Sequence, residues 1–194
     1  MKKRNVLRIA AITTALLSAL VAGCGGDSPD KLIASSKEFL AKNDSKAAVI
    51  QLKNALQQNP NLGEARFLLG KALLESGDMA GAEVELRKAL ELKFAAEQTT
   101  PLLARALLST GQAKKVSDEF SKIEMPAGEP NAALKTIVSA AYQAQGNRDA
   151  AQASLTAALA AQPDYEPALL ASARLKAAGR DFAGALVIVD GVLT

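Results

Sequence analysis

The sequence predicts an all-α fold, an α-solenoid of about five helix–turn–helix repeats. Its 194 residues are 49% apolar but only 4% aromatic and contain no Trp, so Ala and Leu must supply most of the core. These two residues are strong helix formers, whereas strands prefer β-branched and aromatic side chains. A regular period supports the same prediction. A polar turn residue recurs at intervals of 34, 34, 35 and 34 residues, at Asp44, Asp78, Gln112, Asn147 and Asp181.

The residue types that carry most enzyme chemistry are scarce in this chain. There is no His, which excludes His-based catalytic pairs and His metal ligands. There is one Cys, which excludes an intrachain disulfide and a Cys-cluster metal site. Carboxylates such as Glu75, Asp78 and Glu83 fall at predicted turns or outer helix positions, without a partner base. We therefore predict a protein that is not an enzyme and that uses no metal and no dissociable cofactor.

Residues 1–23 have the pattern of a signal peptide rather than of a folded element. A basic segment is followed by an apolar stretch over residues 9–22. As a helix this stretch would span about 21 Å, short of the roughly 30 Å hydrocarbon core of a bilayer, so a permanent transmembrane helix is not expected. The segment holds four bases, Lys2, Lys3, Arg4 and Arg8. Without them 19 basic side chains remain against 20 acidic ones, so nucleic-acid binding is not indicated.

The signal segment ends in the string Leu20-Val21-Ala22-Gly23-Cys24, which resembles a bacterial lipobox and contains the only Cys of the chain. The resemblance implies cleavage before Cys24 and a covalent lipid on its thiol. Each buried acyl CH₂ contributes about 0.8 kcal/mol, so a multiply acylated Cys anchors a chain stably. The alternative is an ordinary signal peptide in which the Cys stands by chance. Residues 24–28 would form the lipidated Cys and a short tether.

Gly25, and not Asp, follows the Cys. By resemblance to known sorting rules, this favours the periplasmic face of the outer membrane of a Gram-negative bacterium.

Paired helical patterns follow the tether, each pair separated by a short polar or Gly-containing turn. Apolar residues recur there at three- and four-residue spacing, as expected for amphipathic helices. An Asp or Asn before a helix is a favourable N-cap, and a Gly before it suits the end of the preceding helix. The predicted pairs are 31–42 with 46–58, 63–76 with 79–92, 102–110 with 113–123, 132–145 with 148–161, and 166–178 with 182–193.

Alignment on the turns also aligns small and large residues, which predicts where the helices cross. A small residue recurs in the first helix at Ser36, Gly70, Ala104, Ser139 and Ala173. In the second helix a small or β-branched residue recurs at Ala48, Ala82, Val116, Ala151 and Ala185, and a larger one follows four positions later at Leu52, Leu86, Phe120, Leu155 and Val189. Small residues let helix axes approach closely, and the larger ones fill the seam.

This pattern resembles the tetratricopeptide repeat (TPR), most clearly in Leu69-Gly70, Leu73, Gly77-Asp78, Ala82, Leu86 and Ala89. The resemblance implies a right-handed solenoid whose first helices line a concave groove for a protein partner. The family's early Trp is missing from every repeat, and its Tyr is kept only as Tyr142. The predicted repeats are 29–62, 63–96, 97–131, 132–165 and an incomplete fifth over 166–194. An unspecific helical bundle does not account for the period.

Two segments depart from the regular pattern. Residues 124–131 contain two Pro and a Gly, which stops the third repeat early; this either changes the superhelical angle or only lengthens the loop. Residues 191–194 stand in the apolar end of the fifth second helix, where solenoids normally carry a polar capping face. We therefore expect an exposed apolar edge and a longer natural array.

One position on the first helices is basic in four of five repeats, at Lys37, Lys71, Arg105 and Arg174, with Ala140 in the fourth. In TPR folds this position resembles the one that faces the concave groove. We call these four side chains the basic ladder. They predict contacts with an anionic partner, such as a carboxylate or an acidic segment of a protein. The alternative is a solvated stripe whose sign is chance.

Three strings resemble a narrower group, the PEP-CTERM system TPR-repeat lipoproteins, which are associated with exosortase and exopolysaccharide loci. They lie at 47–56, 64–71 and 101–106. The resemblance implies a membrane-anchored scaffold in exopolysaccharide production or export. An alternative is a TPR lipoprotein of pilus or outer-membrane assembly, similar to a pilotin. A direct glycan-binding module is a third interpretation, for which few aromatic side chains are present to stack on sugars.

Overall fold

The computed structural model describes residues 26–193, and within that range every regular element is an α-helix. The predicted signal peptide and Cys24 lie outside the described residues. The helices are α2 (Pro29–Ala41), α3 (Ser45–Gln58), α4 (Gly63–Ser76), α5 (Met79–Glu91), α6 (Ala96–Ser109), α7 (Ala113–Phe120), α8 (Glu129–Ala144), α9 (Arg148–Ala161), α10 (Glu166–Ala178) and α11 (Phe182–Leu193). The all-α solenoid predicted from the period is confirmed.

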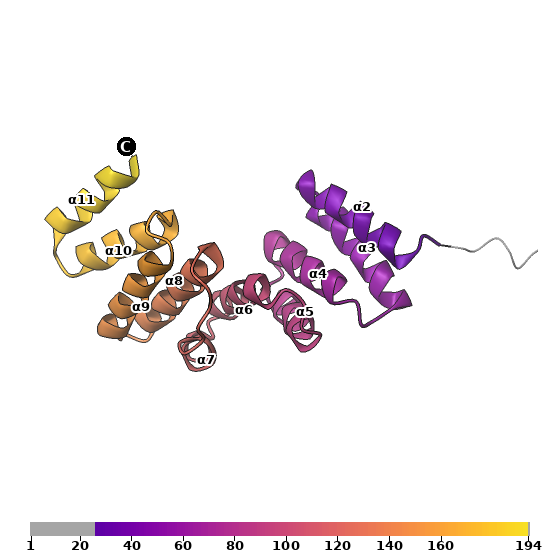
Figure 1. Cartoon of the computed structure of the whole chain (residues 1–194), viewed down its shortest axis with the longest axis horizontal. Helices are drawn as coiled ribbons and strands as arrows, with labels where there is room; N and C mark the ends of the chain where they lie inside the picture. Colours follow the sequence, from indigo (N-terminus) through magenta and orange to yellow (C-terminus); the bar gives the residue numbers. More distant parts are fainter. Residues whose placement is uncertain (1–25, 194) are drawn as a thin grey trace, which may run out of the picture.

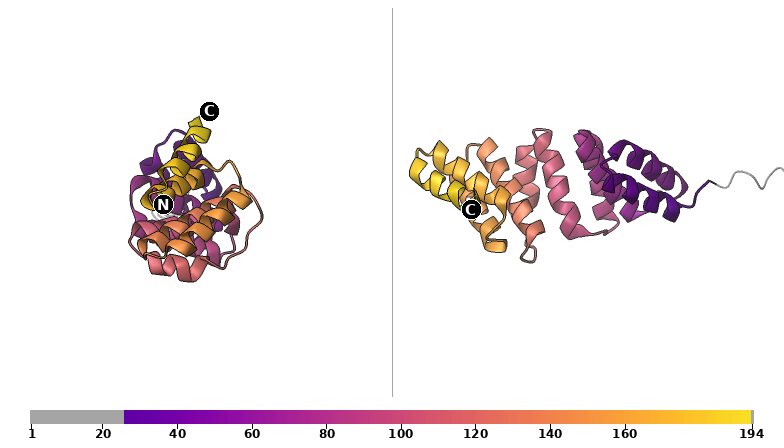
Figure 2. Two further views of the ribbon diagram at one scale, coloured as in Figure 1. Left: turned by 90° about the vertical axis from the view of Figure 1, so that its left-hand side faces the viewer. Right: turned by 90° about the horizontal axis from the view of Figure 1, so that it is seen from above.

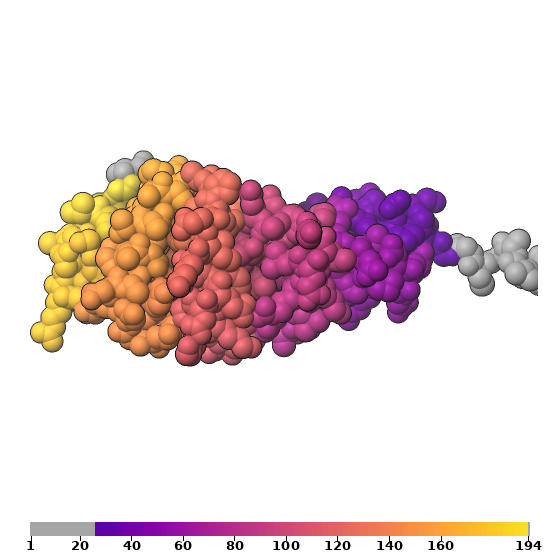
Figure 3. Space-filling model, turned by 60° about the horizontal axis from the view of Figure 1, so that its bottom comes forward, coloured from indigo at the N-terminus to yellow at the C-terminus, as the bar shows by residue number. Residues whose placement is uncertain are grey.

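Consecutive helices form hairpins that stack along one axis, with α2 and α11 at opposite ends (Figure 1). The second helix of each of the first two hairpins also packs on the next first helix, as α3 does on α4 and α5 on α6. Figure 2 shows the elongated array from its end and from above. The surface in Figure 3 shows successive repeats as bands in close contact. Each repeat therefore buries its apolar faces against its neighbours, as in other solenoids.

Local capping explains why the turns recur with the repeat. The side chain at the turn accepts the backbone N–H three residues later in four repeats, at 2.9–3.1 Å: Asp44 from Ala47, Asp78 from Gly81, Asn147 from Ala150 and Asp181 from Gly184. Gly77 closes α4 in the left-handed region at φ 88°. Gln112 makes no such cap; its amide donates to Glu83 of the preceding repeat at 2.9 Å instead.

The small and large residues of the seam lie where the repeat pattern predicts. Ala48, Ala82, Val116 and Ala151 are fully buried, and Leu52, Leu86 and Leu155 beside them are equally inaccessible. Gly70 allows α4 and α5 to approach each other closely. A Cβ built on it would stand 2.6 Å from Cγ of Leu86. The tight crossing of α4 and α5 predicted at Gly70 is therefore confirmed.

The third repeat departs from the predicted helix bounds. α6 begins at Ala96, a turn and a half before the expected start at Leu102, and it contains Pro101. Proline removes one backbone donor in a helix. Here Thr99 and Thr100 donate their hydroxyls to carbonyls of the first turn, and all three side chains are buried.

The second helix of this repeat is short, and the next helix starts early. α7 ends at Phe120 rather than at Ile123, and α8 starts at Glu129 rather than at Ala132. Pro130 is compatible with the first turn of α8 because the N–H groups there have no partner within the helix. The irregular segment is therefore shorter than the predicted 124–131 at its C-terminal end.

A buried lysine supports the place where α7 stops. Lys135 of α8 is 8% exposed, and its Nζ donates to the carbonyls of Ser121 at 3.3 Å and Ile123 at 2.9 Å. These carbonyls follow the last turn of α7. The lysine thus satisfies acceptors that a longer helix would have paired.

The last helix leaves an apolar surface uncovered, as the sequence predicts. Its exposed apolar side chains are Phe182, Leu186, Val187 and Leu193, which are 62–80% exposed. Val189 is only half-buried, whereas its counterparts in the earlier repeats, such as Leu52 and Leu86, are inaccessible. In the first two hairpins the second helix also packs on the first helix of the following hairpin, as α3 does on α4 and α5 on α6.

Candidate partner-binding groove

The four side chains of the basic ladder stand on four of the first helices. Lys37 lies on α2, Lys71 on α4, Arg105 on α6 and Arg174 on α10, and all four are exposed. Ala140 takes the equivalent place on α8 and is half-buried. The array is curved, and the first helices line its inner, concave side. The lowest point of this concave side, called the dip here, lies at α6 (Figure 1).

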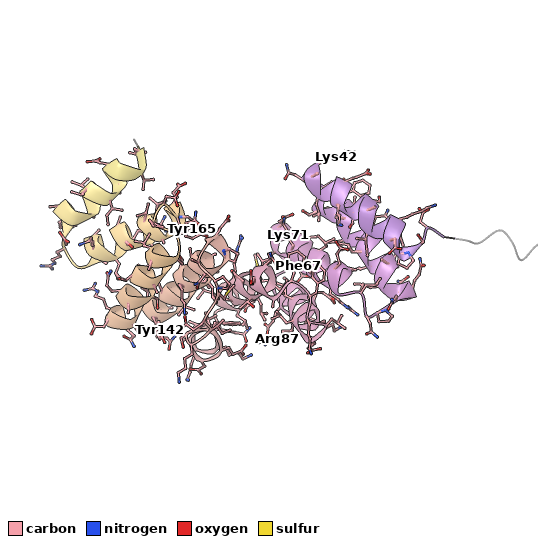
Figure 4. The ribbon with its side chains drawn as sticks, in the orientation of Figure 1. Lys42, Phe67, Lys71, Arg87, Tyr142 and Tyr165 are labelled. Carbon is pink, nitrogen blue, oxygen red and sulfur yellow. The ribbon has the colours of Figure 1, made fainter. Side chains whose placement is uncertain are left out.

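A pocket of about 350 Å³ opens between three of these helices. We call it the central pocket. It is lined by Phe67 and Lys71 of α4, Gln98, Pro101 and Leu102 of α6, and Glu129, Pro130 and Ala133 of α8. Most of this lining is apolar, and Lys71, Gln98 and Glu129 supply its polar groups. Figure 4 shows Lys71 and Phe67 on one side of the dip and Tyr165 on the other.

Packing behind the pocket fixes the orientation of Phe67. Its ring centroid lies 5.7 Å from that of Phe94, with the planes tilted by 44°. Such a tilted arrangement is favourable for aromatic pairs. Phe94 is itself held against Gly63, where an added Cβ would stand 2.7 Å from Cβ of Phe94. Phe67 therefore offers a preformed apolar wall rather than a freely rotating side chain.

Acidic groups compensate part of the basic ladder. Nζ of Lys37 lies 2.7 Å from Oε1 of Glu64 in an exposed ion pair between α2 and α4. Within residues 26–193, Lys71, Arg105 and Arg174 form no such ion pair. In the middle of the groove, Lys71 and Arg105 are therefore cations without an ion-pair partner among the described residues, and Lys71 lines the central pocket.

The pKa of Tyr165, the residue directly before α10, is shifted by charges of both signs. Burial raises the pKa of its hydroxyl, and the nearby carboxylate of Glu129 raises it further, while Arg105 lowers it. Glu129 starts α8 and Arg105 belongs to α6, so charged groups from two other helices act on this one phenol. Arg105 and Glu129 therefore both contribute to the electrostatic environment of Tyr165.

Comparison with known proteins agrees with this architecture. Residues 39–98 match a family model described as tetratricopeptide repeat. The fold is similar to MamA (41-end) from Desulfovibrio magneticus RS-1, with 18% identity, a TM-score of 0.67, and coverage of 87% of this chain and 94% of that one. The fold is that of a TPR solenoid.

Two other TPR-like structures are similar at comparable levels. PilF of Pseudomonas aeruginosa has a TM-score of 0.67 at 14% identity, covering 85% of this chain and 75% of that one. YrrB, described as a TPR protein with an unusual peptide-binding site, has a TM-score of 0.63 at 16% identity, covering 84% of this chain and 83% of that one. No curated protein matches the sequence significantly. At these identities the likeness concerns the fold.

The carboxylates considered for acid–base chemistry have structural partners in the TPR array. Asp78 caps α5, and Glu75 accepts the Ser45 hydroxyl at 2.8 Å. Glu83 accepts hydrogen bonds from Gln112 and Arg87. Burial alone would raise the pKa of Glu83, but these two donors outweigh it and the pKa is lowered.

Across residues 26–193 the structure contains no cluster of His, Cys, Asp and Glu side chains suited to a metal ion. No helix in the same range is long and apolar enough to cross a membrane. What the groove offers chemically is non-covalent recognition through apolar contact and charge.

Apart from Lys71, the residues of the central pocket were not predicted as a site from the sequence. Phe67, Pro101 and Pro130 stand on three different helices, α4, α6 and α8, and only the superhelical stacking brings them together. One available signal was the position of Phe67, four residues before Lys71 and therefore on the same helix face. An aromatic side chain beside a groove cation is uncommon in a chain with five Phe, two Tyr and no Trp.

Proposed function

We propose that this protein is a lipid-anchored scaffold that holds another protein in its concave groove. The TPR fold indicates a protein-interaction scaffold, because stacked first helices create an extended concave surface. The observation that carries the choice of surface is the pairing of exposed cations with an apolar pocket. Lys71 lines the central pocket, and Arg105 stands on the adjacent first helix.

The proposed anchor is the covalent lipid on Cys24. The lipobox string at 20–24 supports it, and so does the absence of any other Cys. Only a few residues separate Cys24 from Pro29, where the first helix begins. The scaffold would therefore work close to the membrane surface, which we propose to be the periplasmic face of the outer membrane.

The proposed process is exopolysaccharide production or export linked to a PEP-CTERM and exosortase system. It is supported by the strings at 47–56, 64–71 and 101–106, which resemble lipoproteins of that system. The alternative is a role in pilus or outer-membrane assembly, which the likeness to PilF favours. In both cases the groove would hold a protein, so the identity of that protein distinguishes them.

The test is affinity capture of the full-length lipidated protein from its own membrane. Wild type would be compared with the double variant Lys71→Glu/Arg105→Glu. The matched control is Lys46→Glu/Lys53→Glu, which makes the same charge change at two exposed positions of the second helix α3. We expect a partner that is retained by wild type and the control, is lost with the groove variant, and is released by rising salt.

The outcomes separate the alternatives. A captured component of polysaccharide synthesis or export supports the proposal, and a pilus or secretin component supports the alternative. Helix content should be unchanged in both double variants, because all four side chains are exposed. Equal capture by wild type and the groove variant over a salt series would show that the basic ladder is only a solvated stripe.

A further inference from the structure

The central pocket has room for one inserted group rather than for a flat contact. Its volume of about 350 Å³ is at the lower end of the range for small-ligand sites. Phe67, Pro101 and Leu102 form much of its lining, and Pro130 and Ala133 complete the apolar part. Pro side chains are rigid, and Phe67 is held by Phe94. The pocket is thus preformed, which reduces the entropic cost of binding.

The polar groups around this pocket carry opposite charges. Lys71 on α4 contributes an ammonium group, and Glu129 at the start of α8 contributes a carboxylate. Lys37, the next cation along the groove, is paired with Glu64 at 2.7 Å. A polyanion laid along the groove would meet these two carboxylates as well as the cations. The charge pattern therefore favours a ligand with a localised negative charge over a continuous one.

We infer that the central pocket recognises a peptide segment in which one bulky apolar side chain stands beside an acidic residue. The apolar side chain enters the pocket between α4, α6 and α8. The neighbouring carboxylate pairs with Lys71, the cation of the lining. This inference rests on the proposed function, since it names the chemistry that the groove partner presents.

The two contributions should differ in size and in salt dependence. Burial of one Leu or Phe side chain corresponds to about a tenfold or larger gain in affinity. A charge pair at the exposed Lys71 contributes about fivefold at most and weakens with salt. The apolar side chain would thus supply most of the affinity, and the carboxylate would fix the register of the peptide.

The experiment selects binders from a displayed library of random nine-residue peptides on the detergent-solubilised full chain. We expect the enriched peptides to share a Leu, Ile, Met or Phe adjacent to Asp or Glu. Ala133→Phe fills the pocket from α8 and should weaken the enriched peptides at least tenfold. Ala133→Leu is a smaller filling substitution for the case in which Phe disturbs the fold. Ala160→Phe is the control, an exposed alanine of the second helix α9 outside the pocket.

Each result decides the inference. Enriched peptides that carry acids but no common apolar residue, or that bind Ala133→Phe and Ala133→Leu as well as wild type, overturn it and leave the charge-dependent groove of the proposed function intact. The absence of any enrichment overturns it too. Competition by polygalacturonate that exceeds competition by the best peptide would assign the groove to a polyanionic glycan instead. Failure of the proposed function itself would appear separately, as capture that is insensitive to Lys71→Glu/Arg105→Glu.

Discussion

Lys37 and Glu64 connect the first helices of the first two repeats, with Nζ of the lysine 2.7 Å from Oε1 of the glutamate. The two side chains are 53% and 40% exposed, so solvent screens the pair and it adds little to the free energy of unfolding. Its main consequence is electrostatic. It neutralises one end of the basic ladder and leaves Lys71 and Arg105 as the cations that border the centre of the groove.

Removal of Glu64 should therefore extend the cationic surface. We expect Glu64→Gln to tighten binding of an acidic groove partner by up to about fivefold, which is the range for an exposed charge pair. The gain should disappear at high salt. Fluorescence polarisation with an acidic peptide would measure it. Glu91→Gln, which removes an exposed carboxylate from the second helix α5, is the control. A similar gain in both variants would mean that only net charge matters.

Gly70 should be the most sensitive position of the seam. Gly70→Leu would drive a side chain into Leu86, whose Cγ lies 2.6 Å from the place of a Cβ on residue 70. Overpacking of this kind costs about 1–3 kcal/mol, equivalent to a fall of very roughly 2–12 °C in the thermal midpoint for a chain of this size. Lys37→Ala should lower it by much less.

The double variant Gly70→Leu/Leu86→Ala tests the cause, because it removes the group that the new side chain would strike. Thermal unfolding of wild type, Gly70→Leu, Leu86→Ala and the double variant gives the coupling energy. We expect the double variant to recover part of the loss. Purely additive losses would show that the crossing of α4 and α5 is not the source of the effect.

The sequence predicts those parts of the fold that local rules determine. Asp44 and Asp78 cap the helices that follow them because an N-cap acts within three residues of its own position. Gly70 stands out because the repeat aligns it with other small residues. The early start of α6 was not predictable in this way. It depends on Thr99, Thr100 and Pro101 being buried together, which is a consequence of packing between repeats.

The candidate site was predictable in part. The basic ladder could be predicted, because its side chains occupy one aligned position of the repeat and the period alone identifies that position. The central pocket could not, because Phe67, Pro101 and Pro130 come from three different helices and meet only through the stacking. The compensation of Lys37 by Glu64 was missed for the same reason.

Lys135 should be important for stability although it is charged. Lys135→Met keeps a long apolar side chain but leaves the carbonyls of Ser121 and Ile123 without this donor. An unsatisfied buried acceptor costs about 1–3 kcal/mol; because Ser121 and Ile123 are half-buried, we expect a loss toward the lower end of that range and faster proteolysis of the segment after α7. Lys122→Met, at an exposed neighbouring position, is the control. An unchanged thermal midpoint for Lys135→Met would contradict the capping role.

Tyr165 offers a spectroscopic probe of the groove. Burial and the Glu129 carboxylate raise the pKa of its hydroxyl, and Arg105 lowers it. Glu129→Gln should therefore lower this pKa, because a negative charge that opposes the phenolate is removed. Arg105→Glu should raise it. Ultraviolet titration in a Tyr142→Phe background would follow Tyr165 alone, since the chain has two Tyr.

The same shift has a consequence for stability at high pH. The folded protein binds the phenolic proton more tightly than the unfolded chain, whose ordinary value is 10.0. Stability should therefore decline as the pH rises above about 10, and less so in Glu129→Gln. If the pKa of Tyr165 moved in the opposite direction in Glu129→Gln or in Arg105→Glu, the charge of that residue would not act on Tyr165 as described.

The lipid anchor is tested by Cys24→Ser. Transfer of diacylglycerol requires a thiol, and cleavage follows it, so the variant should remain an unprocessed precursor without the acyl chains. Metabolic labelling with a palmitate analogue should mark wild type and not the variant; labelling of both would refute the assignment of Cys24.

Gly25→Asp tests the sorting of the protein separately, because it keeps the thiol of Cys24 and changes only the residue that follows it. If the proposed address is correct, this variant should still be labelled but should move from the outer-membrane to the inner-membrane fraction, and an unchanged distribution would mean that Gly25 does not direct the protein.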